Sequence, residues 1–272
     1  MSTSEYLQPD DLTGECSRWF FADASSSSGV VLLVHGLNQK PSSWLELIHH
    51  LNRNGLHVYR LALQGHRGLA FVDMQQVNAG IWESELLDGR REIAGRFPAS
   101  PVYLIAYSLG GLVSMIVQLK TGQRLFARQV LLAPALAIRP YTRLARLLCR
   151  LFPYLPSRSP RGYVANREGT TAEAYRALFQ LEKEFRMFTD FSILNIPTLV
   201  MMRQDDELIS YKGTLRFLEN RELGEWRMVP LLDEAAVPKC SCAYRHLIVD
   251  SRSAGEKIWR RITEEMHLFL HG

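Results

Sequence analysis

VYLIAYSLGG, residues 102–111, is the stretch of sequence that indicates the fold most directly. An apolar strand runs straight into Ser108, and a helical pattern begins at once after it. The nearby residues Ala106, Gly110 and Gly111 are all small. A serine at such a strand-to-helix corner takes a strained backbone conformation, so bulky groups two positions before or after it would collide. The usual form of the turn is Gly-x-Ser-x-Gly, and Ala106 here replaces the first glycine.

The turn predicts a reactive serine. It lifts the Ser108 hydroxyl above the sheet and aims it at the N-terminus of the following helix, where backbone N–H groups can stabilise an anion. The alternative is that Ser108 only caps the helix. The order strand-Ser-x-Gly-Gly-helix favours a nucleophile.

Apolar runs alternate with helical patterns along the rest of the chain, which is typical of a parallel sheet with crossover helices. We expect strands at 29–34, 57–63, 102–106, 129–132, 197–202 and 225–230, and a first, antiparallel strand at 17–22. We expect helices at 41–53, 83–97, 109–120, 211–222 and 256–270. The predicted fold class is therefore α/β, a mostly parallel twisted sheet with helices on both faces.

One gap breaks this alternation. About sixty residues, from Ala135 to Asn195, separate two strands that ordinarily need one short helix between them, and loops of that length are usually functional. We expect an inserted helical cap at about 135–195, and we refer to these residues as the cap. The predicted organisation is a flexible segment at 1–16 followed by one domain at 17–272.

Composition narrows the class of protein. Hydrophobic residues make up 47% and charged residues 22%, as in ordinary globular proteins. The net charge is only +4, and no run of Lys and Arg interleaved with aromatics suggests nucleic acid binding. No apolar run approaches the roughly 18 residues of a membrane span, and the polar N-terminus is unlike a signal peptide, so we expect a cytoplasmic protein. Cys240 and Cys242 lack a second pair at metal-ligand spacing, so we expect no metal and no cofactor.

A serine nucleophile needs a base, and the base needs an acid to orient it. In sheets of this kind the acid follows a late strand and the histidine follows the last one. Asp205 and Asp206 both follow the strand at 197–202. We choose Asp206 because it stands three residues before Ile209, which would pack the next helix. His246 is the expected base, since it alone lies between the last strand and the C-terminal helix.

An oxyanion hole is expected at the end of the strand VVLLVHGLN, residues 30–38. This strand leaves the sheet at its carboxyl edge, where α/β active sites gather. Gly36 would let the backbone turn so that the N–H of Leu37 faces the serine, and the N–H of Leu109 would be the second donor. We interpret His35 as a residue that positions this loop.

Taken in order, these motifs resemble the α/β-hydrolase superfamily, in particular the serine hydrolases grouped with monoacylglycerol lipases and lysophospholipases. The resemblance runs from about Trp19 to the C-terminus and includes the Asp206-x-x-Ile209 turn and HLIVD at 246–250. It implies a serine carboxylic-ester hydrolase, an esterase or lipase that cleaves esters of apolar acyl chains through an acyl-enzyme. The expected partner is a small-molecule ester or lipid. Three features depart from the pattern: Ala106, Arg203 where glycine is common, and the long loop 233–245.

Two other functions stay open. One is a serine peptidase of the aminopeptidase type with the same fold. That activity commonly needs acidic side chains to hold the substrate amine, whereas the cap segment is basic and apolar. The other is a non-catalytic binding module, against which the complete set of candidate catalytic residues argues.

The cap begins with an amphipathic pattern, IRPYTRLARLLCRLFPYLP at 138–156. On a helix the arginines and the leucines fall on opposite sides. The residues concerned are Arg139, Arg143, Arg146 and Arg150 on one side and Leu144, Leu147, Leu148 and Leu151 on the other. Two interpretations are open: the arginines stay in water, or they contact an anionic membrane surface or head group. In both, we expect the leucines to be buried over Ser108 as an apolar pocket.

Overall fold

A seven-stranded sheet forms the centre of the molecule in the computed structural model, which describes residues 14–22, 27–68, 71–232 and 244–272. The strand order is β1-β3-β2-β4-β5-β8-β9. β1 pairs with β3 in the antiparallel sense, and every other pairing in this sheet is parallel. The bounds are Arg18–Phe20 (β1), Gly29–Val34 (β2), Leu56–Leu61 (β3), Val102–Tyr107 (β4), Arg128–Leu132 (β5), Thr198–Arg203 (β8) and Trp226–Leu231 (β9).

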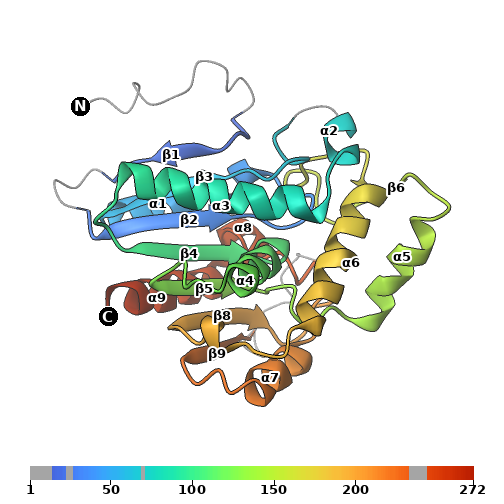
Figure 1. Cartoon of the computed structure of the whole chain (residues 1–272). Helices are drawn as coiled ribbons and strands as arrows, with labels where there is room; N and C mark the ends of the chain where they lie inside the picture. The colour runs from blue at the N-terminus through green and yellow to red at the C-terminus, as the bar shows by residue number, and fades with distance from the viewer. Residues whose placement is uncertain (1–13, 23–26, 69–70, 233–243) are drawn as a thin grey trace.

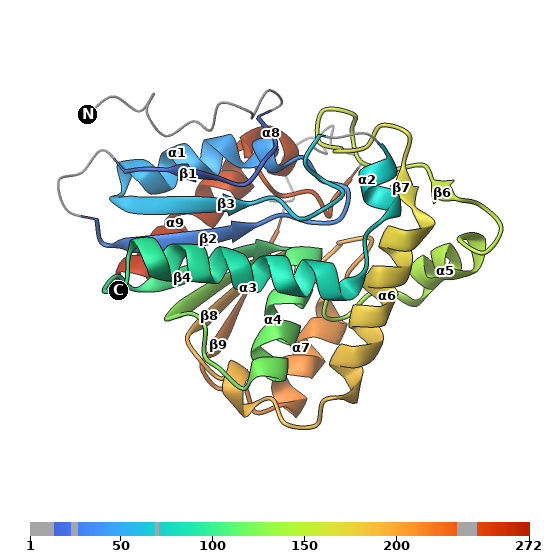
Figure 2. The same ribbon diagram turned by 45° about the horizontal axis from the view of Figure 1, so that its top comes forward.

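Helices cover both faces of the sheet (Figures 1 and 2). α3 and α4 lie on one face, and α1 and α9 lie on the opposite face. Their bounds are Leu45–Arg53 (α1), Ala79–Arg96 (α3), Leu109–Thr121 (α4) and Glu256–His271 (α9), and the shorter helices are Phe71–Gln75 (α2), Tyr211–Asn220 (α7) and Ser251–Ala254 (α8). A 3-10 turn, Pro41–Trp44, precedes α1. The predicted α/β class is therefore confirmed.

The predicted strands and helices are present, with ends that differ by a few residues. α3 begins four residues before the predicted start because the Asn78 side chain accepts a hydrogen bond from the N–H of Ile81 and caps the helix. The helix predicted from residue 41 begins at Leu45, after the 3-10 turn. The short helices α2 and α8 were not predicted, since neither is long enough to show a helical period.

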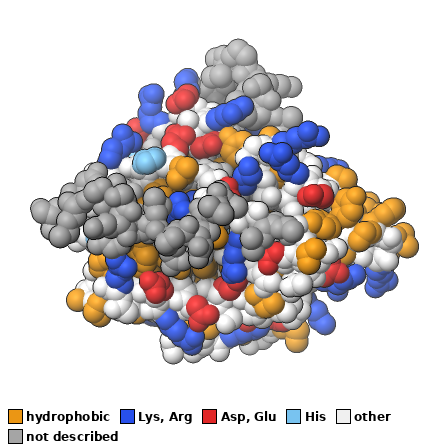
Figure 3. All heavy atoms as spheres, turned by 90° about the horizontal axis from the view of Figure 1, so that it is seen from above, with side chains coloured by type: hydrophobic (Ala, Val, Ile, Leu, Met, Phe, Trp, Pro, Cys, Tyr) orange, Lys and Arg blue, Asp and Glu red, His pale blue; other side chains and the backbone are white. Residues whose placement is uncertain are grey.

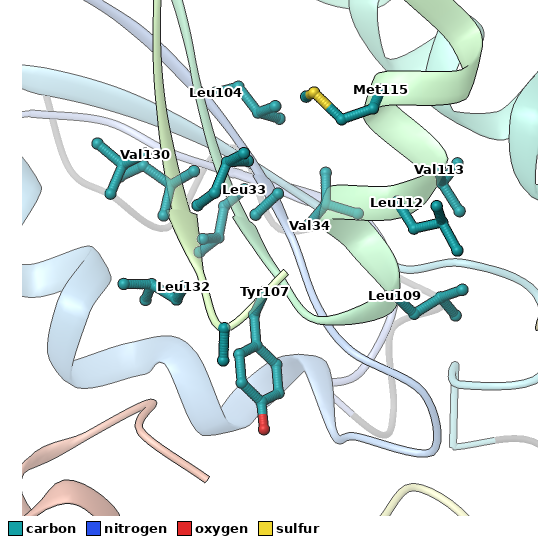
Figure 4. Packing of buried hydrophobic residues seen from close by; sticks show 14 of the residues in the cluster. Leu33, Val34, Leu104, Tyr107, Leu109, Leu112, Val113, Met115, Val130 and Leu132 are labelled. Carbon is teal, nitrogen blue, oxygen red and sulfur yellow. The ribbon is translucent and has the colours of Figure 1, made fainter. Parts of the chain in front are cut away.

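The core lies on both faces of the sheet, with one part between the central strands and α4 and another under α1 and α9. Residues 30–34 of β2 are fully buried, as expected for a strand covered on both faces. Figure 4 shows aliphatic side chains of β2, β4, β5 and α4 packed together. Tyr107 stands at the end of β4 and points its hydroxyl away from this cluster, toward the carboxyl edge of the sheet.

The residues of the cap form helices and one short strand pair. The cap contains a 3-10 turn (Pro140–Arg143), α5 (Leu144–Leu148), the strand pair β6 (Tyr154–Leu155) and β7 (Thr170–Thr171), α6 (Ala172–Met187) and a second 3-10 turn (Ser192–Leu194). α6 packs against α2, α3 and α4, whereas α5 packs against α6 and the turn before it. α5 therefore lies at the periphery of the molecule (Figure 1).

The prediction that this segment buries its leucines is wrong for three of the four. Leu144, Leu147 and Leu151 are 58%, 55% and 74% exposed, and Leu148 is half-buried. The physical reason is length: α5 is too short for a long amphipathic face, and it has covering elements on one side only. Figure 3 shows hydrophobic side chains gathered on the side where α5 lies, with basic side chains beside them. Contact of this segment with a membrane stays a prediction, which cosedimentation with anionic vesicles would test.

The structure also bears on the predictions of a flexible first segment and of no membrane span. Residues 1–13 of the predicted flexible segment lie outside the described residues, as do Cys240 and Cys242. Glu15 is buried, and its carboxylate accepts hydrogen bonds from the N–H and hydroxyl of Ser42. Within the described residues no helix is long and apolar enough to cross a membrane.

Candidate active site

Ser108 occupies the corner between β4 and α4. Its φ is 49°, a left-handed conformation that residues other than glycine rarely adopt. The corner is held from both sides, because the Ser108 N–H donates to the carbonyl of Leu132 and the Ser108 carbonyl accepts from the N–H of Ala135. The hydroxyl consequently stands above the carboxyl edge of the sheet, at the start of α4.

The small residues around the serine are required by close packing. A Cβ on Gly110 would lie 2.7 Å from the carbonyl oxygens of Val34 and His35, and a Cβ on Gly111 would lie 2.9 Å from Pro134 Cβ. Glycine at these positions lets α4 approach the ends of β2 and β5. Ala106 is fully buried, so the extra methyl group of this departure is accommodated in the core.

The structure brings together the three side chains that the sequence selected. His246 follows β9 in the chain, and its Nε2 lies 2.9 Å from the Ser108 hydroxyl oxygen. Its Nδ1 lies 2.7 Å from Oδ2 of Asp206. A carboxylate can only accept, so Nδ1 carries the proton and Nε2 is free to accept from the serine hydroxyl. His246 is 3% exposed and Asp206 is fully buried.

Asp206 is held as an anion. Burial by itself would raise its pKa, but the charge of His246, the hydrogen bond to the ring and two backbone donors outweigh burial and lower the pKa below its ordinary value. The donors are the N–H groups of Leu208 and Ile209, each 2.8 Å from Oδ1. Ile209 is also buried, as the choice of Asp206 assumed.

Asp205, the alternative acid, faces away from His246. Its carboxylate pairs with Arg203 and Arg245 and is about half exposed. Arg203, a departure from the family pattern, thus holds the neighbouring aspartate. Residues 233–243 of the long loop before His246 lie outside the described residues.

The backbone of His246 is fixed by two residues that the sequence analysis did not identify. The carboxylate of Glu207 accepts from the N–H groups of Arg245 and His246. The Tyr107 hydroxyl donates to the His246 carbonyl at 3.0 Å. Both contacts join segments distant in the chain, so no local pattern could have revealed them.

Two backbone N–H groups beside Ser108 have no acceptor among the described residues. They belong to Leu37 and Leu109, the predicted oxyanion donors, and both residues line the same cavity as Ser108.

The structure gives Gly36 a different role from the predicted one, in which it lets the backbone turn. Gly36 has no positive φ, and a Cβ there would lie 2.7 Å from the Tyr107 ring, so this glycine permits close approach. The left-handed turn is made instead by Asn38, at φ 50°.

The loop that carries Leu37 rests on two buried histidines. His35 Nε2 accepts from the N–H of Leu63, so His35 is a positioning residue, as interpreted from the sequence. His66, which the sequence analysis missed, accepts from the N–H of Asn38 at 2.8 Å through Nε2. The two rings lie 4.4 Å apart. Burial lowers the pKa of His66 to about 4 and also lowers that of His35, so both rings are neutral near pH 7.

The cap also holds this loop. Asn38 exchanges hydrogen bonds with Asn166 through its side chain, and its carbonyl accepts from the N–H of Ala165. The N–H of Lys40 donates to the carbonyl of Tyr163. The candidate oxyanion loop is therefore fixed between the buried histidines and residues 163–166.

A cavity of about 520 Å³ opens at Ser108 and His246 under the cap. Its lining includes aliphatic and aromatic side chains, among them Leu144, Leu148, Leu155, Leu178 and Phe179. It also includes more polar side chains, among them Ser157, Arg158, Ser159, Tyr175 and Tyr244. No aspartate or glutamate is among the described residues that line it.

The strand order, the serine at the strand-to-helix corner and the inserted helical cap define an α/β-hydrolase. The family model for serine aminopeptidases of family S33 matches residues 25–183, more than half of the chain. The chain belongs to this family. No curated protein sequence matches it significantly.

Solved structures of lipases share the fold. One is a structure reported for the metagenome-derived lipolytic enzymes LipS and LipT, with a TM-score of 0.74 and 19% identity over 96% of this chain and 98% of the other. A soluble variant of monoglyceride lipase from Saccharomyces cerevisiae, in complex with a substrate analog, has a TM-score of 0.70 and 15% identity over 93% and 90%. Monoacylglycerol lipase from Paleococcus ferrophilus has a TM-score of 0.65 and 20% identity over 93% and 98%. Identities this low show a common fold, and the substrate must be argued from the site.

The neutral histidine below the candidate oxyanion loop predicts a loss of stability in mild acid. An unfolded histidine takes up a proton near pH 6.5, whereas folded His66 does so only near pH 4. The free energy of unfolding should therefore fall as pH drops from about 6.5 to 4, by on the order of 3 kcal/mol from His66. His66→Gln, whose amide oxygen can still accept from Asn38, should weaken this pH dependence in urea unfolding. If the free energy of unfolding depends on pH in the same way in the wild type and in His66→Gln, this role of His66 is contradicted.

Proposed function

We propose that this protein is a serine carboxylic-ester hydrolase in which Ser108 is the nucleophile, His246 the general base and Asp206 the acid that orients it. The observation that carries the proposal is the continuous hydrogen-bonded chain from the Ser108 hydroxyl through His246 to Asp206, beside two N–H groups for which the described residues provide no acceptor. A chain of this kind activates a hydroxyl that is otherwise a poor nucleophile.

The proposed reaction has two stages. Ser108 Oγ attacks the ester carbonyl as its proton passes to His246 Nε2, and the N–H groups of Leu37 and Leu109 stabilise the resulting oxyanion. His246 then returns the proton to the leaving alcohol, which leaves an acyl-enzyme. Water, activated by the same histidine, attacks the acyl group and restores the serine. The buried Asp206 carboxylate stabilises the imidazolium that forms in both stages.

The aliphatic part of the cavity supports an apolar acyl chain as substrate. Leu148, Leu178 and Phe179 line it together with Ser108, and Phe179 is itself buried. Burial of each substrate CH₂ contributes about 0.8 kcal/mol, so a few methylenes change kcat/KM by tens of fold.

Aminopeptidase activity is the second candidate, because the family model that matches the chain describes serine aminopeptidases. Recognition of a free amine needs a carboxylate within reach. Among the described residues that line the cavity, the charged side chain is basic, namely Arg158. This charge favours the ester hydrolase over the peptidase.

The two neighbouring aspartates give a matched test of the triad. Asp206→Asn should lower kcat by about 10⁴, because an amide favours the wrong imidazole tautomer and leaves the imidazolium without a counter-charge. Asp205→Asn, with the same chemical change one residue away, should leave kcat within about threefold. The measurement is kcat of both variants in steady-state kinetics with one ester. A larger loss of kcat in Asp205→Asn than in Asp206→Asn would transfer the acid role to Asp205.

A graded panel of p-nitrophenyl esters tests the acyl specificity. We expect kcat/KM to rise from acetyl to at least octanoyl esters, since each added methylene enters the apolar part of the cavity. Phe179→Ala should flatten the rise by removing part of that lining. Fastest hydrolysis of the acetyl ester would show that no acyl-chain site exists, and hydrolysis of aminoacyl anilides in preference to every ester would favour the peptidase.

A further inference from the structure

Among the described residues that line the cavity, Arg158 is the one lysine, arginine, aspartate or glutamate. It lies in the cap between β6 and β7, next to two lining hydroxyls, those of Ser157 and Ser159. Arg158 is exposed, so it stands where the cavity meets solvent.

No acidic side chain among the described residues pairs with this guanidinium. The carboxylates around His246 have other partners: Asp206 pairs with His246, and Asp205 pairs with Arg203 and Arg245. Glu207 accepts from the backbone of the His246 loop. A positive charge at a cavity that has no acid in its described lining gives that cavity a positive potential, which favours anions.

The hydroxyls of Tyr141 and Tyr175 belong to residues that line the same cavity as Arg158. Burial raises the pKa of both phenols, so they are neutral donors near pH 7. A planar guanidinium with neutral hydroxyl donors beside it is suited to a carboxylate or a phosphate, which it can bind with two parallel hydrogen bonds.

The surrounding cap has the same sign of charge. Residues 135–163 contain six arginines and no acid, and Arg146, Arg150 and Arg161 are exposed. Figure 3 shows basic side chains beside the hydrophobic ones on this side of the molecule. Positive charge on this surface of the cap attracts anionic molecules and repels cationic ones.

We propose that the cavity selects acyl esters that carry an anionic group, a carboxylate or a phosphate, and that Arg158 with the flanking serine hydroxyls is the site that binds this group. The proposal rests on the proposed ester hydrolase and names its substrate class. The apolar part of the cavity takes the hydrocarbon chain, and the arginine takes the charged end of the same molecule.

Binding and turnover separate this proposal from the one it rests on. Binding is measured by calorimetry with Ser108→Ala, which cannot form an acyl-enzyme, using a 1-acylglycerol 3-phosphate and the 1-acylglycerol with the same chain. We expect the 1-acylglycerol 3-phosphate to bind about tenfold more tightly than the 1-acylglycerol, a difference of about 1.4 kcal/mol in binding free energy. This preference for the anionic ligand should shrink at high salt. Turnover is measured with the wild-type protein, by comparing kcat/KM for a p-nitrophenyl hemiester of a dicarboxylic acid with kcat/KM for the neutral ester of equal length. This second assay shows whether a carboxylate is selected as well as a phosphate.

Matched variants assign the preference to one residue. Arg158→Gln should abolish it in both assays, while Arg158→Lys should retain part of it because the charge remains. Arg146→Gln removes an equal charge from α5 outside the cavity lining and should keep the preference. Hydrolysis of the neutral ester should be unchanged in Arg146→Gln, and a thermal unfolding midpoint equal to that of the wild type would show that Arg158→Gln is folded.

Each outcome bears on one proposal. Equal binding and turnover of anionic and neutral partners, or a preference that survives Arg158→Gln, would overturn the anion site and leave the ester hydrolase intact. A preference in binding without hydrolysis of any ester would support the anion site and overturn the hydrolase.

Discussion

The left-handed turn at Ser108 is the constraint on which the rest of the site depends. A non-glycine residue at φ 49° is strained, and here the hydrogen bonds of Leu132 and Ala135 hold it in place. The turn allows α4 to begin directly under the hydroxyl. That position requires glycine at 110, because a Cβ would strike the end of β2. One backbone conformation thus sets the position of the serine, of the Leu109 N–H and of the loop that carries Leu37.

Around this turn, buried polar groups are fixed by complementary partners. His246 is held at both ring nitrogens, and its backbone is held by Glu207 and Tyr107. The charge of Asp206 is compensated by donors on the following turn, while His66 beneath the oxyanion loop is kept neutral by burial. A polar network buried in this way is favourable only when its members are satisfied, so the geometry is set before a substrate arrives.

Local patterns in the sequence predicted most of the fold and the three central side chains. The serine turn, the buried strands and the choice of Asp206 depend on residues adjacent in the chain. His66 could not be found in this way, because its partner Asn38 is 28 residues distant, and the Tyr107 contact with His246 spans 139 residues. The prediction that the leucines at 144–151 are buried is wrong for a related reason. Their amphipathic pattern is real, but burial requires a covering element, and a sequence pattern does not show where such an element ends.

Hydrolases of several kinds share this family and this fold. The chemistry of this chain must therefore be determined from its serine and from the cavity above it. The central claim is that Ser108 is acylated, and a fluorophosphonate probe tests it most directly, because it reacts with an activated serine and stays attached. We predict one adduct, located on Ser108 by peptide mass spectrometry, strongly slowed in His246→Ala and absent in Ser108→Ala. Equal labelling of the wild-type protein and Ser108→Ala, or an adduct on another residue, would contradict the claim.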